Sequence, residues 1–131
     1  MQRPLEITSL TKAFGNFVAV KDFSTLIQPG EFVSLLGHSG CGKSTVLSIV
    51  AGLSQATLGG IVIDGREVTE PGLERAMVFQ SPCLLPWMSA LDNVVLAARQ
   101  RHGDKAVEVA KKYMELVGIG EFAAQMPAEL S

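Results

Sequence analysis

The sequence has 131 residues, the length of one domain, which excludes a second full hydrophobic core. Hydrophobic residues make up 47% and charged residues 18%, a composition that excludes a disordered chain. The formal net charge of −2 provides no bulk basic field, so we expect no nucleic-acid partner. Two cysteines are too few for a disulfide scaffold, and every apolar run is far shorter than the ~18 residues of a membrane span.

The first part of the sequence predicts antiparallel strands. Residues 5–10 alternate between apolar and polar types with the period of a half-buried strand. Residues 17–27 are rich in Phe, Val, Thr and Ile, and a proline–glycine turn follows them. Residues 61–68 have the form of a two-residue hairpin around Asp64 and Gly65, because this pair tolerates the positive φ angles that such a turn requires.

Two later segments predict the core of an α/β arrangement. Residues 31–36 are apolar almost throughout, which is typical of a parallel strand covered on both faces. A glycine-rich turn comes next, and the apolar spacing of residues 44–53 then suits a buried helix. Residues 75–79 form another short apolar run, which we expect to be a second core strand.

The pattern becomes helical from residue 81 onward, so we place the last boundary near Gln80. Ser89 can cap a first helix whose apolar face carries Leu91, Val94, Val95 and Ala98. Asp104 can cap a second helix, which Gly118 would end and whose apolar face carries Val107, Ala110, Met114 and Val117.

A glycine-rich motif between the predicted strand and helix carries the clearest chemistry, since it matches G-x-x-x-x-G-K-[ST]. Glycines let backbone N–H groups curl around phosphate oxygens, and the positive end of the following helix faces the same anion. Lys43 would add a charge for the β- and γ-phosphates, and the Ser44 hydroxyl would bind Mg²⁺. We expect nucleoside triphosphate contacts from Gly37, His38, Ser39, Gly40, Cys41, Gly42, Lys43, Ser44 and Thr45. At the variable positions, His38 is interpreted as a solvated loop residue and Cys41 as a small residue.

With two further residues at matching spacings, the sequence resembles the ATP-binding subunit of ABC transporters over essentially the whole chain. Phe14 precedes the loop, and the resemblance implies that its ring stacks on adenine; a core phenylalanine is the alternative. Gln80 follows the loop and resembles the glutamine that completes the Mg²⁺ shell and senses the γ-phosphate; an ordinary polar residue is the alternative. The implied cofactors are ATP and Mg²⁺, with Lys43 and Gln80 as catalytic residues and with Ser44 and Gln80 as metal ligands.

The resemblance implies an α/β fold of the P-loop NTPase (ABC ATPase) class, in truncated form. It would combine an N-terminal antiparallel β subdomain, a partial core sheet with the P-loop helix, and a helical subdomain. We expect a single incomplete ABC ATPase domain over 1–131, with the first two parts in about 1–79 and the helical subdomain in about 80–131. The last five residues resemble the approach to the family signature Leu-Ser-Gly-Gly-Gln, which implies an ATP contact by Ser131. The Asp-Glu strand and the switch histidine of the family have no counterpart, so we expect an N-terminal fragment that is inactive alone.

The segment Leu84-Leu85-Pro86-Trp87 is similar to importers for nitrate, sulfonate, taurine and bicarbonate-type anions. The resemblance implies that this segment contacts the transmembrane permease; the alternative is that Trp87 fills the core of the helical subdomain. The other implied partners are a second ATPase subunit and, indirectly, a solute-binding protein. The implied location is peripheral, at the cytoplasmic face of the inner membrane.

The implied function is to bind ATP with Mg²⁺ and, in the complete protein, to hydrolyse it and drive import of nitrate or a related small anion. Two other functions stay open. One is another P-loop class, a kinase or a GTPase, although the guanine-reading Asn-Lys-x-Asp motif is missing from the sequence. The other is a non-catalytic nucleotide-binding remnant.

Overall fold

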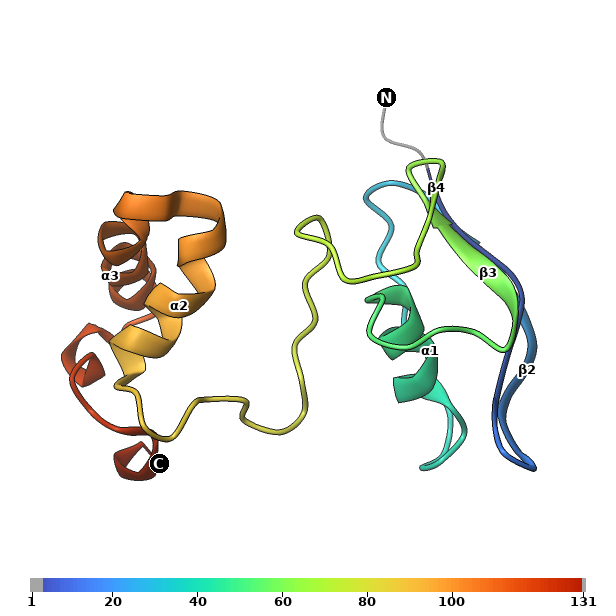
Figure 1. Ribbon diagram of the computed structural model, residues 1–131, viewed down its shortest axis with the longest axis horizontal. Helices are drawn as coiled ribbons and strands as arrows, with labels where there is room; N and C mark the ends of the chain where they lie inside the picture. The colour runs from blue at the N-terminus through green and yellow to red at the C-terminus, as the bar shows by residue number, and fades with distance from the viewer. Residues whose placement is uncertain (1–3, 131) are drawn as a thin grey trace. The chain divides into compact units, whose positions relative to one another are not determined.

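The computed structural model describes residues 4–130, and the chain divides into two compact units, Met1–Val78 and Phe79–Ser131 (Figure 1). Each unit has a hydrophobic cluster of its own. Within the part of the chain that the structure describes, no helix combines the length and the apolarity that a membrane span requires.

The first unit is built on a four-stranded sheet, with the order β2-β1-β3-β4 and antiparallel pairing throughout. Its strands are β1 (Leu5–Phe14), β2 (Phe17–Ile27), β3 (Leu58–Ile63) and β4 (Arg66–Glu67). This confirms the predicted antiparallel β subdomain; β2 has the predicted bounds, and β1 is four residues longer than its predicted segment.

The turn between β3 and β4 confirms the predicted two-residue hairpin. Asp64 has a φ of +52° and Gly65 a φ of +77°, so both central residues are in the left-handed region. This geometry matches the right-handed twist of the flanking strands.

Helix α1 (Lys43–Val50) covers one face of the sheet and completes the core of the first unit (Figure 1). Its Val46 and Ile49 pack with the buried strand residues Ile7, Leu10, Val20 and Ile61. The helix ends earlier than predicted because Gly52 adopts a φ of +77°. The Gly52 amide donates to the Ile49 carbonyl and the Leu53 amide to the Ser48 carbonyl, which is the bonding of a Schellman cap.

The two predicted core strands, 31–36 and 75–79, are wrong: neither segment is a strand in the structure. The side chains of Phe32, Leu36 and Val78 are more than 90% exposed. The physical reason is that an apolar run becomes a strand only when a neighbouring strand accepts its backbone hydrogen bonds. Among residues 4–130, the paired strands are β1 to β4 alone.

The second unit consists of helices α2 (Ala90–His102) and α3 (Ala106–Leu116), joined by the 3₁₀ turn η1 (Gly103–Lys105). Two more 3₁₀ turns follow, η2 (Gly120–Phe122) and η3 (Pro127–Glu129). The core contains Val95 of α2 and the small side chains of α3, with Leu91, Val94 and Ala98 packed against them. This confirms the predicted apolar face of the first helix.

The helix ends were predicted with mixed success. Ser89 caps α2, and its hydroxyl oxygen accepts a hydrogen bond from the Asp92 amide at 3.1 Å, as predicted. Asp104 does not cap α3, because it lies within η1 and the residue at the cap position is Lys105. Gly118, with a φ of +74°, ends α3 as predicted, since its amide donates to the Glu115 carbonyl.

The apolar face predicted for α3 was only partly right. Ala110 and Met114 are buried, and so is Ala106, which lies four residues before Ala110. Val107 and Val117, which were assigned to the same face, are 47% and 65% exposed. Residues at i, i+4 and i+8 share one face of a helix, and on this face the small side chains of Ala106 and Ala110 pack with Val95 of α2.

Candidate nucleotide-binding site

The loop before α1 has the backbone geometry of an anion site. Gly40 and Gly42 have φ values of +80° and +90°, in the left-handed region, and Gly42 is the N-cap residue of α1. The amides of the first helical turn have no carbonyl partner within the helix, and the helix dipole is positive at this end. Successive N–H groups in such a turn form a concave site that favours negative charge.

The side chain of Lys43 lies back across this loop. Its ammonium group donates hydrogen bonds to the carbonyl oxygens of Gly37 and His38, both at 2.7 Å. It also donates to the Cys41 sulfur at 3.2 Å. The charge expected to meet the β- and γ-phosphates is therefore held at the loop by three neutral acceptors.

Gly42 also fixes the loop against the sheet. A Cβ atom added to Gly42 would lie 2.4 Å from the carbonyl oxygen of Ala19 and 2.9 Å from Cγ2 of Val20, both in β2. A hollow of about 200 Å³ lies beside this contact. Its lining combines apolar side chains with three residues of the loop: Val20, Phe23, Leu35, Leu36 and Val46 with Cys41, Gly42 and Lys43.

The other loop residues are accessible to a ligand. His38, Ser39, Cys41 and Ser44 are exposed, and Thr45 is half-buried in the first turn of α1. An exposed serine hydroxyl at a helix start is an oxygen ligand of the type that Mg²⁺ prefers. The sequence interpretation of Cys41 as only a small residue missed its contact with Lys43; its position two residues before the lysine was the available signal.

Phe14 is the last residue of β1 and is 55% exposed, which places its side chain outside the core. It pairs with Phe17 across the β1–β2 hairpin. The ammonium of Lys12 lies over its ring, 5.0 Å from the centroid. The ring therefore has accessible surface on which a flat base could stack.

Gln80 belongs to the second unit and the loop to the first, so the expected meeting of Gln80 with the loop stays a prediction. Gln80 is exposed. Its role as a metal ligand and its pairing with Lys43 stay predictions. Ser131, the expected signature contact, lies outside the described residues.

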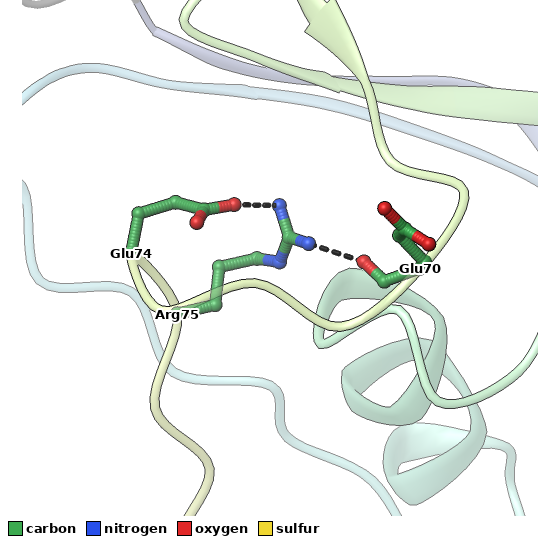
Figure 2. Close-up of polar contacts among 3 residues, drawn as sticks. All are labelled: Glu70, Glu74 and Arg75. Carbon is green, nitrogen blue, oxygen red and sulfur yellow. Dashed lines mark hydrogen bonds and ion pairs between the residues drawn. The ribbon is translucent and has the colours of Figure 1, made fainter. Parts of the chain in front are cut away.

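Arg75 organises the segment that follows β4 (Figure 2). Its guanidinium group forms an ion pair with Glu74 at 2.6 Å and donates a hydrogen bond to the Glu70 carbonyl; its buried Nε has no partner. The Glu70 carbonyl in turn packs on the end of α1, where a Cβ at Gly52 would lie 2.2 Å away. Sequence reasoning missed this contact because it assigned 75–79 to a strand, although the adjacent opposite charges were visible.

The Leu84–Trp87 segment presents its tryptophan to solvent. Trp87 is 72% exposed, which contradicts the alternative that it fills the helical core. Asn93 of α2 holds the segment, because its side-chain amide accepts from the Leu85 amide at 2.7 Å and donates to the carbonyls of Leu85, Met88 and Ser89. Sequence reasoning did not single out Asn93, which follows Asp92 in the first turn of α2.

Comparison with known proteins gives one consistent family. Residues 20–131 match the ABC transporter family. The nitrate import ATP-binding protein NrtC of Synechococcus elongatus is 46% identical over 121 residues, which are 89% of this chain and 18% of that protein. The Fe(3+) ions import ATP-binding protein FbpC of Brucella abortus is 45% identical over an alignment of 136 positions, which covers 98% of this chain and 38% of that protein.

The solved structures give the same result. The dimeric post-hydrolysis state of the ATP-binding cassette MJ0796, bound to ADP and Pi, superposes with a TM-score of 0.83 at 29% identity. The match covers 97% of this chain and 63% of the cassette. The chain thus spans less than half of the length of either curated relative.

Proposed function

Because the chain belongs to the ABC transporter family of ATP-binding proteins, we propose that it binds ATP with Mg²⁺ through loop 37–45. In the complete protein, hydrolysis of this ATP drives solute import through a membrane permease. The observation that carries the proposal is the position of Lys43, whose ammonium group is held by loop carbonyls at the positive end of α1. A triphosphate in the loop would meet this cation and the free amides of the first helical turn together.

Each site residue has a proposed role. The amides of the loop glycines hold the phosphates, and Lys43 neutralises charge that builds up on the β- and γ-phosphates during transfer. The exposed hydroxyl of Ser44 and the side-chain oxygen of Gln80 are hard ligands that suit Mg²⁺, which supplies charge stabilisation when bound. Phe14 stacks on the base.

The proposed partners follow from the family and from the exposed Leu84–Trp87 segment. A second ATPase subunit is supported by the dimeric state of the similar cassette. A permease contact near Trp87 is supported by the 72% exposure of that side chain, since exposed tryptophans often anchor protein interfaces. The protein would lie peripherally at the cytoplasmic face of the inner membrane, with a solute-binding protein as an indirect partner.

The proposed solute is nitrate or a related small anion, because a relative named for nitrate import is 46% identical to this chain. A second candidate is ferric iron, because the relative named for Fe(3+) import covers 98% of the chain at 45% identity. The nucleotide loop serves either transport system, so the two candidates are separated only by measuring import.

ATP titration of the wild-type chain and of Lys43→Ala tests nucleotide binding. Lys43→Ala should remove most of the ATP affinity, because the phosphates lose their counterion in the loop. Lys111→Ala, at an exposed lysine of α3, is the matched control and should bind as wild type. Equal affinity in wild type and Lys43→Ala would refute the assignment of the loop. Binding without turnover by the complete protein would favour the non-catalytic alternative.

Growth assays test the solute. A strain that lacks the complete gene is complemented with wild type or with the Lys43→Ala variant, and it grows on nitrate as the sole nitrogen source. Growth that requires an intact Lys43 on nitrate, and not under iron limitation, supports import of the anion. The reverse pattern would select ferric iron and refute nitrate.

A further inference from the structure

The side chain of Lys12 lies between a backbone oxygen and an aromatic ring. Its ammonium group donates a hydrogen bond to the carbonyl of Gln55 at 2.7 Å and lies 5.0 Å from the centroid of the Phe14 ring. The second distance is within the range of a cation–π interaction. Lys12 and Phe14 are two residues apart in β1; the register of β1 against β2 shifts between Lys12 and Ala13, and the ammonium group nevertheless lies over the ring.

Two more hydrogen bonds fasten the same end of β1 to the segment that contains Gln55. The Thr57 amide donates to the Thr11 carbonyl at 2.8 Å, and the Ala13 amide donates to the Thr57 hydroxyl oxygen at 3.0 Å. With the bond from Lys12, three contacts therefore hold the strand immediately before Phe14.

The segment that contains Gln55 and Thr57 follows α1, the helix that begins at the phosphate loop. The eight residues of α1 span about 12 Å at 1.5 Å per residue, and Val46 and Ile49 bury the helix on the sheet. Lys43 is at its first residue, and the segment to which β1 is tied follows its last turn. The phosphate loop and the strand end that carries Phe14 are thus attached to one rigid element.

The Phe14 ring needs a contact outside the hydrophobic core to hold it in one orientation. Phe14 is 55% exposed, so core packing does not select its rotamer. Ordering an exposed side chain during binding costs conformational entropy, and a side chain that is already ordered avoids that cost. The Lys12 ammonium lies over the ring, and Phe14 still keeps 55% of its surface exposed.

We propose that Lys12 is a positioning residue for the nucleotide, whose anchored ammonium group holds the Phe14 ring ready to stack on the base. This inference rests on the proposed stacking role of Phe14. A different role for Lys12, direct attraction of the phosphates, is an outcome of the test below.

The experiment compares ATP with inorganic tripolyphosphate, which carries a similar phosphate charge and no base. Both ligands are titrated against the full chain as wild type, Lys12→Met, Lys12→Arg, Phe14→Ala and the Lys12→Met/Phe14→Ala double variant. Lys21→Met, at an exposed lysine of β2, is the matched control for the loss of one positive charge. Urea unfolding of each variant detects any loss of stability. If Lys12→Met proves unstable, Lys12→Gln removes the charge while keeping a donor.

Lys12→Met is expected to weaken ATP binding by about two- to five-fold, the range of an exposed cation–π contact, and to leave tripolyphosphate binding unchanged. Lys12→Arg keeps the cation and should restore ATP binding. The double variant should bind ATP no more weakly than Phe14→Ala, because the lysine acts through the ring.

Three results would overturn the inference, and they differ from one another. If Phe14→Ala leaves ATP binding unchanged, the stacking role is wrong and the inference fails with it. If Phe14→Ala weakens ATP binding while Lys12→Met does not, only the inference fails. If Lys12→Met weakens ATP and tripolyphosphate equally, the lysine attracts the phosphates and does not position the ring.

Discussion

Replacing Gly42 by alanine tests how the phosphate loop is attached to the sheet, and Gly40 offers a control within the same loop. Both glycines are in the left-handed region, at +90° and +80°. At Gly42 an added Cβ would lie 2.4 Å from a backbone oxygen of β2, whereas at Gly40 it would meet nothing within 4 Å. The two variants share the conformational cost and differ only in the steric contact.

The expected magnitudes follow from this difference. A non-glycine residue in the left-handed region costs about 1–2 kcal/mol, so Gly40→Ala should lower the free energy of unfolding by this amount. Gly42→Ala adds the displacement of a packed backbone group, for which overpacking costs of about 1–3 kcal/mol are typical. We therefore expect a total loss of about 2–5 kcal/mol for Gly42→Ala.

Urea unfolding of the two variants and the wild type measures this difference. With a slope of about 1–3 kcal/mol per molar urea, the midpoint of Gly42→Ala should lie below that of Gly40→Ala by about 1 M. Equal midpoints for the two variants would refute the argument, because they would show that the loop is not held by close approach to β2. ATP affinity measured on the same samples then reports whether the loop depends on that contact for binding.

Three further predictions concern the second unit. Ser89→Ala should destabilise the chain by about 1 kcal/mol in urea unfolding, because the Asp92 amide loses its acceptor, and Ser89→Asp should restore most of that loss. Gln80→Ala should leave ATP affinity largely intact and slow Mg²⁺-dependent turnover of the complete protein; unchanged turnover and Mg²⁺ affinity would remove the proposed metal role. Trp87→Ala should change the free energy of unfolding by less than about 0.5 kcal/mol, since the side chain is 72% exposed, but reduce import by the assembled transporter; a large loss of stability with normal import would contradict the docking role.

The features that the sequence predicted correctly depend on neighbouring residues. Asp64 and Gly65 define their hairpin because only a few residue types accept two consecutive positive φ angles. Ser89 is a cap because its hydroxyl reaches an amide three residues away. The assignment of 37–45 as a phosphate loop stays a prediction, but it rests on neighbouring residues in the same way, since a contiguous set of glycines, a lysine and a serine contains the whole motif.

The features that the sequence predicted wrongly depend on more than the residue types in the segment itself. Residues 31–36 have the composition of a buried strand, but a strand forms only with a partner, and composition does not supply the partner. Asp104 is an acceptable cap by residue type, yet the chain turns through η1 before α3 begins, so the cap position falls on Lys105. The contacts of Lys12 with Gln55 and of Arg75 with Glu70 depend on the path of the chain around α1.

Helix α1 connects these observations physically. Its first residue provides the cation of the phosphate loop, and its buried Val46 and Ile49 fix it on the sheet. The segment that follows α1 is hydrogen-bonded to the end of β1 before Phe14. The Glu70 carbonyl packs against Gly52, the residue that caps the end of α1. Because a helix bends little over eight residues, a displacement at one end moves the other. The phosphate loop, the aromatic ring and the segment organised by Arg75 are therefore coupled through one short, buried element, although they are far apart in the sequence.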